Sequence, residues 1–256
     1  MNYPTLSDLN DPSLIPPLGS RSAPDVGPTA VMVSTGPDMK QVRKRHPGAG
    51  EKSFFISTLL VSDSDGKGLS FAGPYIGAPY AVMLLESLIA KGARHIVVFG
   101  WCGAVSEDLE PGDLFLPDDA VCDEGTSRNY MEIGKGLPLV APSKDLTAAF
   151  EKRLNQDGIS FKKGRIWTTD AIYRETRKKI DYFRHKGAKA VEMECSALFA
   201  AAAFRNVDVT ALLVVSDDVG SDKWNPGFRK ERFKEARKSG LDAVIDFSRE
   251  LIENGP

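Results

Sequence analysis

Two acidic motifs in the second half of the chain carry the side chains best suited to chemistry. Glu192-Met193-Glu194 sets two carboxylates and a thioether before an Ala-rich segment, and Asp217 follows an apolar run at residues 210–215. Such a run would end where α/β proteins bind ligands, at the carboxyl ends of strands. A carboxylate can accept hydrogen bonds from two neighbouring hydroxyls, as in a ribose, and a second carboxyl can carry a proton. The pattern therefore indicates chemistry on a sugar that is joined to a base.

The composition argues against several classes of protein. The 256 residues include 33 basic and 35 acidic side chains, a net charge of −2, which argues against nucleic acid held by bulk charge. No apolar run approaches the roughly 20 residues that a membrane span needs. The three cysteines are far apart and odd in number, so neither a disulfide framework nor a metal site is expected. Because no signal peptide pattern opens the chain, we expect a cytoplasmic protein.

The first 28 residues differ from the rest of the chain. They contain six prolines, each of which fixes φ and removes a backbone donor, so regular helices and strands are not expected there. We expect an extended arm at residues 1–28, lying on the body or on a neighbouring subunit. The remaining residues, 29–256, contain no repeat and no internal linker, which predicts one domain.

Strand-type and helix-type apolar patterns alternate through this domain, which favours an α/β protein with a largely parallel central sheet. A turn is expected at Asp65-Gly66, and the strand at 95–99 is expected to end in a glycine loop at 100–103. The other elements follow the same spacing rules. Strands are expected at 30–34, 54–61, 69–75, 95–99, 113–121, 159–167 and 207–215, and helices at 39–45, 78–91, 143–156, 175–185, 194–205 and 228–253.

Seven short motifs follow one another between residues 29 and 220. They are Gly73-Pro74-Tyr75-Ile76-Gly77-Ala78-Pro79, Gly100-Trp101-Cys102-Gly103-Ala104-Val105, Pro111-Gly112-Asp113-Leu114, Asp123-Glu124-Gly125-Thr126-Ser127, Thr168-Thr169-Asp170-Ala171-Ile172-Tyr173, Glu192-Met193-Glu194 and Ser216-Asp217. Their order and spacing resemble the nucleoside phosphorylase family of the purine and uridine phosphorylase type. The resemblance implies a three-layer αβα sandwich with a mixed, partly barrel-like central sheet. It also implies a homo-oligomer, a trimer or hexamer, whose active sites are completed by a neighbouring chain.

The resemblance gives the first acidic motif a role in binding ribose. Glu194 matches the carboxylate that holds the 2′- and 3′-hydroxyls, Met193 matches a residue that packs against the sugar, and Glu192 is their companion. Charged acceptors make stronger hydrogen bonds than neutral ones. The simpler interpretations are that Glu194 only stabilises a helix dipole, that Met193 is core, and that Glu192 orients its neighbours.

The resemblance assigns the second motif to the base. Asp217 matches the residue that gives a proton to purine N7 as the glycosidic bond breaks, and partial burial beside Asp218 would favour the protonated acid. Ile172 stands where the family usually has a stacking Phe, and Tyr173 follows as in the family. Uracil has no N7, so Asp217 favours a purine. The simpler interpretation is that Asp217 and Asp218 cap a loop.

The phosphate side departs most from the family. The usual Arg and the usual Ser or Thr are replaced by Val98 and Trp101. Gly36 and Lys40 match the family's N-terminal phosphate turn loosely. Backbone N–H groups of Gly100, Trp101, Cys102 and Gly103 could still hold an anion, with Arg128, Lys40, Arg43 or Arg45 as the cation. A solvated surface face is the ordinary interpretation of such a cation.

These assignments predict phosphorolysis of a nucleoside, with a purine as the favoured base, to free base and ribose 1-phosphate. Inorganic phosphate is then the co-substrate, and no metal or organic cofactor is expected. A nucleosidase that uses water is the main alternative, because the family's fold also hosts such enzymes and the arginine is missing at Val98. Uridine phosphorolysis and a non-catalytic nucleoside-binding protein remain open.

Overall fold

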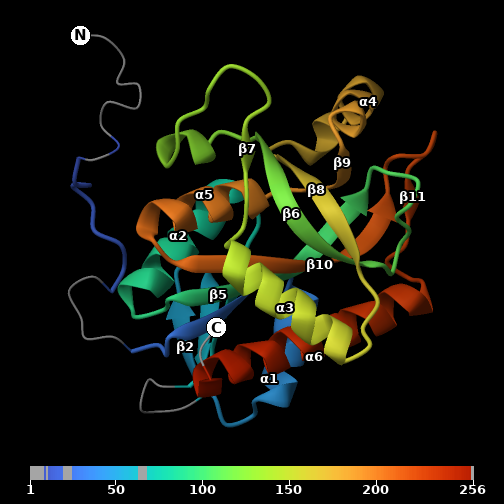
Figure 1. Cartoon of the computed structure of the whole chain (residues 1–256). Helices are drawn as coiled ribbons and strands as arrows, with labels where there is room; N and C mark the ends of the chain where they lie inside the picture. Colours follow the sequence, from blue (N-terminus) through green and yellow to red (C-terminus); the bar gives the residue numbers. More distant parts are fainter. Residues whose placement is uncertain (1–8, 10, 20–24, 63–67, 255–256) are drawn as a thin grey trace.

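The computed structural model describes residues 9, 11–19, 25–62 and 68–254. Its helices and strands alternate along the chain, as the apolar patterns predict (Figure 1). The elements are β1 Thr29–Val33, α1 Gly36–Arg45, β2 Gly50–Phe54, β3 Ser57–Val61, β4 Ser70–Gly73, α2 Ala78–Ala90, β5 His95–Ala104, β6 Leu114–Asp123, η1 Ser127–Asn129, β7 Leu139–Val140, α3 Lys144–Gln156, β8 Lys162–Thr169, η2 Ile172–Arg174, α4 Arg177–His185, β9 Ala188–Glu192, α5 Cys195–Arg205, β10 Asp208–Asp218, β11 Asn225–Pro226 and α6 Glu231–Asn254.

The described strands form one mixed sheet that closes on itself in part. Strands β5, β10, β6, β8 and β9 pair in a ring, because β9 and β10 both pair with β5. From β5 the sheet continues outside the ring through β1, β4, β3 and β2. The mixed, partly barrel-like sheet of the prediction is confirmed. The largely parallel pairing that the pattern favours is present in the long ladders of β5 with β1 and β10 and of β8 with β6 and β9. Short antiparallel pairs join β5 to β9 and β6 to β10 and make the sheet mixed.

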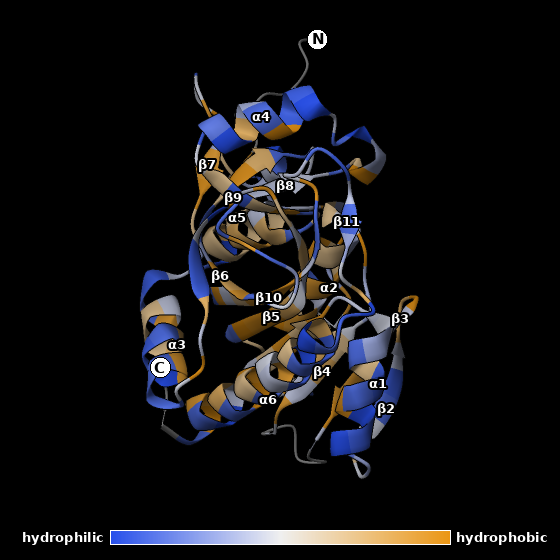
Figure 2. Ribbon diagram, turned by 90° about the vertical axis from the view of Figure 1, so that its right-hand side faces the viewer, coloured by the Kyte–Doolittle hydropathy of each residue, from blue (hydrophilic) through white to orange (hydrophobic). Residues whose placement is uncertain are grey.

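Helices cover the sheet on both sides, and each side has its own apolar core. Alternate residues of β5 point to opposite faces, so Val98 packs with α2 and α5 while Val97 and Phe99 pack with α1, α3 and α6. A strand that is buried on both faces needs an almost continuous apolar sequence. Figure 2 shows this pattern, with hydrophobic strands inside and hydrophilic outer surfaces on α1 and α4.

Strand β5 has a gap along one edge. Strand β1 pairs with its first half, from His95 to Phe99, and β9 pairs on the same edge with Gly103 and Ala104. Neither strand pairs with residues 100–102. Helix α1 begins just after β1, and α5 begins just after β9. Two strand ends and two helix starts therefore converge beside this gap, which is the kind of place where α/β sheets bind ligands.

Several sequence-based boundaries need correction. The expected strand at 54–61 is two strands joined by a hairpin whose turn contains Phe55, a residue with φ of 57°. Strand β9 was not expected. Ser143 lies at the N-cap of α3, yet its hydroxyl accepts a hydrogen bond from Val209 N instead of capping the helix. The turn predicted at Asp65-Gly66 lies outside the described residues.

The predicted arm lies only partly within the described residues, since residues 1–8, 10 and 20–24 fall outside them. The described part has no helix or strand before β1. Where it joins the body, Asp25 binds the end of α2, because its backbone N–H donates to Lys91 O and its carboxylate accepts from Lys91 Nζ. Among the described residues, no helix is long and apolar enough to span a membrane.

Candidate active site

The junction of β9 and α5 holds the first acidic motif. Glu192 is buried, and its carboxylate accepts hydrogen bonds from Thr168 Oγ1 at 2.5 Å, from Glu194 N at 2.6 Å and from Cys195 N at 2.7 Å. The free N–H groups of a helix start favour an anion at this place. Both carboxylate oxygens of Glu192 are thus bound within the chain, an arrangement that positions the motif and does not point Glu192 at a ribose.

Glu194 faces a different element. Its Oε1 accepts a hydrogen bond of 2.5 Å from Gly77 N, at the start of α2, and its side chain remains partly exposed. Burial raises the pKa of Glu194 to about 8, and the nearby charge of Glu192 adds to the rise. Burial also raises the pKa of Glu192 itself. Because burial makes the ionised form of Glu194 costly, a ligand hydroxyl that donates a hydrogen bond to its carboxylate would stabilise that form. Met193, between the two acids, is also partly exposed.

Asp217 lies near the end of β10, with one donor for each oxygen. Ser216 Oγ lies 2.5 Å from Oδ1, and Trp224 Nε1 donates to Oδ2 at 2.8 Å. The Ser216 hydroxyl also lies within hydrogen-bonding distance of Cys102 O, at 3.1 Å. A hydroxyl has one hydrogen, so Ser216 can donate to Cys102 or to Asp217 but not to both. When it donates to Cys102, its oxygen can accept a proton held on Asp217.

Residues 100–103 are not the expected loop. They continue β5, and their ladder with β10 runs from Gly100 to Gly103. The loop prediction is wrong because β10 is long enough to pair with the whole of β5. The extension has a consequence for the site, since Gly103 pairs with Val191 on one side and Asp217 on the other. The two acidic motifs therefore flank β5, about 10 Å apart at two strand spacings.

Two glycines leave space at this crossing. A side chain on Gly103 would come within 3.3 Å of Val191 Cγ1 and 3.6 Å of Asp217 Oδ2. At Gly100 the same addition would meet Ser34 Oγ at 2.7 Å. Both glycines keep space where the strands converge. Cys102 between them is buried, and burial raises the pKa of its thiol well above the ordinary value, so it is no candidate nucleophile.

The expected phosphate position contains a cluster of side chains that belong to the chain itself. The Trp101 indole donates to Asp38 Oδ2 at 2.8 Å, and the Arg237 guanidinium donates to Asp38 Oδ1 at 2.5 and 2.9 Å. Thr35, the N-cap of α1, donates to the same carboxylate at 2.7 Å. The guanidinium of Arg237 also lies over the Trp101 ring, 4.8 Å from its centroid. Asp38 is only 1% exposed, so this fixed carboxylate already occupies the anion-favouring start of α1.

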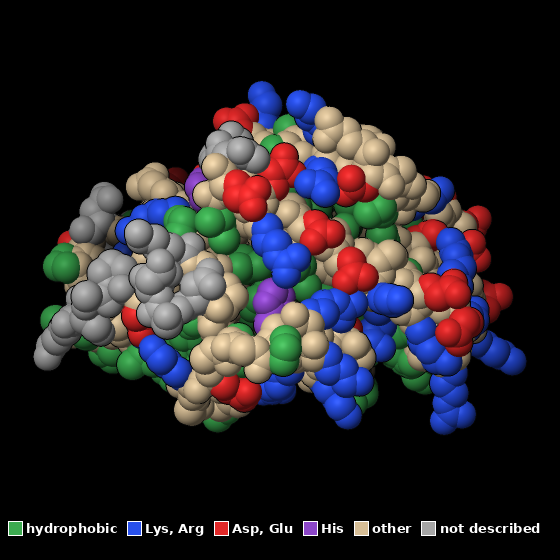
Figure 3. Space-filling view, turned by 90° about the horizontal axis from the view of Figure 1, so that it is seen from below, with side chains coloured by type: hydrophobic (Ala, Val, Ile, Leu, Met, Phe, Trp, Pro, Cys, Tyr) green, Lys and Arg blue, Asp and Glu red, His purple; other side chains and the backbone are tan. Residues whose placement is uncertain are grey.

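The other predicted cations do not converge on this cluster. Arg43 pairs with Glu51 at 3.0 Å and Arg45 pairs with Asp242 at 2.7 Å. The face over α1 and α6 accordingly shows basic side chains next to acidic ones (Figure 3). Lys40 is exposed on α1, and Arg128 is exposed on η1, which packs beside α5. Gly36 begins α1 with open space around it.

The predicted base-binding residues lie at the surface of the single chain. Ile172 is 51% exposed and Tyr173 is 96% exposed, both on η2. Glu175 follows them, and burial together with the charge of Asp217 raises the pKa of Glu175 to about 7. Glu175 therefore lies close enough to Asp217 to interact with it. No sequence pattern singled it out.

Two further residues were missed. Arg237 lies 199 residues from Asp38 in the chain, so only the folded structure could pair them. Trp224 belongs to a segment without periodicity, and its one available signal was a tryptophan a few residues after Asp217.

The raised pKa of Glu194 predicts how stability depends on pH. Between the ordinary value of 4.5 and about 8, the folded chain keeps a proton that the unfolded chain has lost, so stability falls as pH rises through this window. Glu194→Gln should remove that loss. We expect the variant to match the wild type near pH 5 and to be more stable at pH 8, by on the order of a few kcal/mol. Urea unfolding across this pH range is the measurement.

Glu235→Gln is the matched control, because Glu235 is exposed on α6. It should unfold like the wild type at every pH. Equal stability of Glu194→Gln and the wild type at pH 8 would contradict the electrostatic account of this junction.

Comparisons with known proteins agree with this architecture. A family model described as the phosphorylase superfamily matches residues 28–253. The guanosine phosphorylase of Halorubrum lacusprofundi is 26% identical over 188 residues, which cover 73% of this chain and 76% of that protein. A purine nucleoside phosphorylase from Toxoplasma gondii, solved with immucillin-H, superposes with a TM-score of 0.77 at 18% identity, covering 94% of this chain and 99% of that one.

A second solved structure carries a different activity on the same fold. The 5′-methylthioadenosine/S-adenosyl homocysteine nucleosidase of Campylobacter jejuni superposes with a TM-score of 0.74 at 18% identity, covering 87% of this chain and 99% of that one. At such identity the likeness concerns the fold, and it confirms the predicted fold class. The family match spans nearly the whole chain, and we conclude that this protein belongs to the phosphorylase superfamily.

Proposed function

We propose that the chain cleaves the N-glycosidic bond of a purine nucleoside and transfers the ribosyl group to water. The main support for water rather than phosphate as the acceptor is the carboxylate of Asp38, which Trp101 and Arg237 bind at the start of α1. A phosphate ion at that place would meet a buried negative charge. Its attraction to Arg237 would have to exceed that of an existing ion pair.

The flanking motifs support a nucleoside as the substrate. Glu194, partly exposed beside the start of α2, is placed to accept hydrogen bonds from ribose hydroxyls, with Met193 against the sugar. Glu192 positions Glu194 by binding its backbone N–H. The guanosine phosphorylase relative acts on a purine nucleoside by name, which supports a purine here as well. Ile172 and Tyr173 would line the outer side of the base.

Asp217 is the proposed acid. As the C–N bond breaks, its electron pair goes to the base, and the proton of Asp217 goes to purine N7. The Ser216 hydroxyl can then turn from Cys102 O to Asp217 Oδ1 and donate to the new carboxylate. Water attacks the anomeric carbon and gives up a proton, which restores the acid. In these steps the proton that Asp217 gives to the base is replaced by the proton that water gives up, so no further acid or base is needed.

Phosphorolysis is the second candidate. It is supported by the activity named for the guanosine phosphorylase relative and by the open space at Gly36 beside the exposed Lys40. Phosphate would then be the co-substrate, with Lys40, Arg128 or a backbone N–H of residues 100–103 as its ligands. Uridine is a weaker substrate candidate, because it has no N7 to accept the proton of Asp217.

A neighbouring copy would complete the site in the trimer or hexamer that the family resemblance implies. Exposed apolar side chains at the rim support such an assembly, since Ile56 is 89% exposed and Ile76 is 74% exposed. A hydrogen bond from Ser57 Oγ to Pro74 O joins the hairpin that carries Ile56 to the segment that carries Ile76. Water in bulk would be excluded if a second subunit covered these residues.

The acceptor of the ribosyl group can be identified from the products. Purified protein with guanosine, inosine or adenosine should release free base and free ribose at the same rate with and without phosphate. Chromatography of the base and of the sugar product is the measurement. Strict dependence on phosphate with ribose 1-phosphate as product would refute hydrolysis and support the second candidate. Absence of base release from every nucleoside would contradict both.

The role of Asp38 can be tested separately. Asp38→Asn leaves Arg237 without its carboxylate partner, so we expect added phosphate to raise the melting temperature of this variant but not that of the wild type. Breaking a buried ion pair costs about 3–5 kcal/mol, so the variant itself should be less stable. Asp242→Asn, which removes the more exposed partner of Arg45, is the control and should show no response to phosphate. The same response in both variants would count against a dedicated anion position.

The acid role predicts a dependence on the leaving group. Asp217→Asn should slow release of purine bases by about 10²–10⁴-fold. The same variant should cleave 4-nitrophenyl riboside at nearly the wild-type rate, because nitrophenolate leaves without a proton. Ser216→Ala should lower the rate on purines by roughly tenfold, the value of one hydrogen bond to a charged group. Equal losses on both substrates would show that Asp217 only maintains the structure.

A further inference from the structure

Trp224 combines two properties that do not fit a purely structural role. Its indole N–H donates to Asp217 Oδ2 at 2.8 Å, yet the residue is 62% exposed. An indole in water can donate to solvent without help from a carboxylate. An exposed aromatic ring fixed beside the proposed acid therefore needs an explanation from the site.

The segment that carries Trp224 is held at both ends. After Trp224, β11 pairs with the end of β10, with Pro226 opposite Asp217 and Asn225 opposite Asp218. Before Trp224, Asp218 Oδ1 accepts a hydrogen bond of 3.0 Å from Ser221 N. The connection from β10 to β11 is short, so the chain turns back and brings the Trp224 indole against the end of β10. Its contact with Asp217 follows from this geometry.

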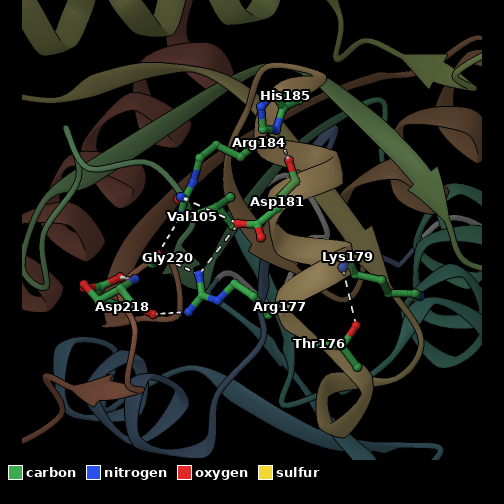
Figure 4. A network of polar contacts seen from close by, with 10 residues as sticks. Val105, Thr176, Arg177, Lys179, Asp181, Arg184, His185, Asp218 and Gly220 are labelled. Atoms are coloured by element: carbon green, nitrogen blue, oxygen red, sulfur yellow. Dashed lines mark hydrogen bonds and ion pairs between the residues drawn. The ribbon is translucent and has the colours of Figure 1, made fainter.

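Two arginines of α4 hold the same segment from outside (Figure 4). Arg177 donates to Gly220 O at 3.0 Å and to Ser221 O, and Arg184 donates to Val105 O at 2.8 Å and to Gly220 O. Carbonyl oxygens bound by charged donors make strong hydrogen bonds. The segment is thus anchored, and a group that it presents to the site keeps its place.

The aromatic group that the family resemblance leads one to expect is absent from its usual place. Ile172 stands there and offers an aliphatic surface that is half exposed. A row of aromatic rings begins instead at Trp224, which contacts Asp217. Trp224 lies 6.3 Å from Phe228 between ring centroids, and Phe228 lies 6.0 Å from Trp101. A purine that takes a proton from Asp217 must lie within reach of this row.

We propose that Trp224 is the base-binding aromatic residue of this chain, holding Asp217 with its N–H and stacking its ring on the purine. The proposal rests on the proposed function for its substrate class. Stacking on an aromatic ring accepts any purine, since every base has a π-face. The site would then select a bicyclic base by ring area and by the proton at N7, and the same ring would bind the free base after cleavage.

Two substitutions separate the two contacts. Trp224→Phe keeps a ring and removes the N–H, whereas Trp224→Ala removes both. We expect Trp224→Ala to raise KM for purine nucleosides by about 5- to 150-fold, which is the loss in affinity expected when one base no longer stacks on an aromatic side chain. Trp224→Phe should keep KM within about threefold. Its pH profile should change, because loss of the donor to the carboxylate moves the alkaline limb of kcat to higher pH.

Tyr182→Ala provides the control, since Tyr182 is an aromatic residue of α4 that is 52% exposed. It should leave KM and the pH profile unchanged. KM values for Trp224→Ala within twofold of the wild type would overturn the stacking role. An unchanged pH profile in Trp224→Phe would overturn the contact with the acid.

A binding experiment tests the proposal without turnover. Free hypoxanthine should quench the tryptophan fluorescence of the wild type, and Trp224→Phe should lose most of that quenching although Trp101 and Trp167 remain. If the wild type cleaved no nucleoside but showed this quenching, the proposed function would fail and the base-binding role would stand. If it cleaved purine nucleosides and quenching persisted in Trp224→Phe, the base-binding role would fail alone.

Discussion

The site depends on how strand β5 shares one of its edges. Strand β1 occupies the first half of that edge and β9 the end, and residues 100–102 between them pair with neither. A sheet in which one partner filled the whole edge would leave no gap. Because β1 and β9 run in opposite directions, their carboxyl ends meet beside the gap. Helices α1 and α5 must then begin there too, and they bring their free N–H groups to a common place.

Both helix starts are neutralised by carboxylates of the chain itself. At α5 the anion is Glu192, bound by two backbone N–H groups, and at α1 it is Asp38, bound by Trp101 and Arg237. The two cases differ in their cation. Glu192 lies beside another acid, Glu194, and burial raises the pKa values of both. Asp38 is compensated by a guanidinium. The acids at the start of α5 would therefore be stabilised by further hydrogen-bond donors, such as the hydroxyls of a ribose. The carboxylate at the start of α1 already has its cation.

Sequence patterns were sufficient for the elements with strong periodicity and for the order of the motifs. They placed Glu194 at the start of a helix and Asp217 at the end of a strand because apolar runs and acidic residues are local signals. They failed where the outcome depended on distant partners. Strand β5 extends to Ala104 only because β10 pairs along its length, and Asp38 has a buried role only because Arg237 arrives from α6. Replacement of the usual phosphate residues at Val98 and Trp101 was visible, but the contacts that Trp101 makes there with Asp38 and Arg237 were not.

Asp217, the proposed acid, and its neighbours show why the missing information matters for chemistry. A carboxyl that must both hold and release a proton needs partners that suit both states. Ser216 can accept from the protonated Asp217 or donate to the ionised form, because Cys102 O provides a second acceptor for its single hydrogen. Trp224 donates in either state, to an oxygen that never needs to carry the proton. In the proposed mechanism, the transferable proton is thus confined to Oδ1, on the side where Ser216 can follow it. A catalytic carboxyl with two fixed donors would be trapped as an anion, whereas one fixed and one reversible donor leave it able to cycle.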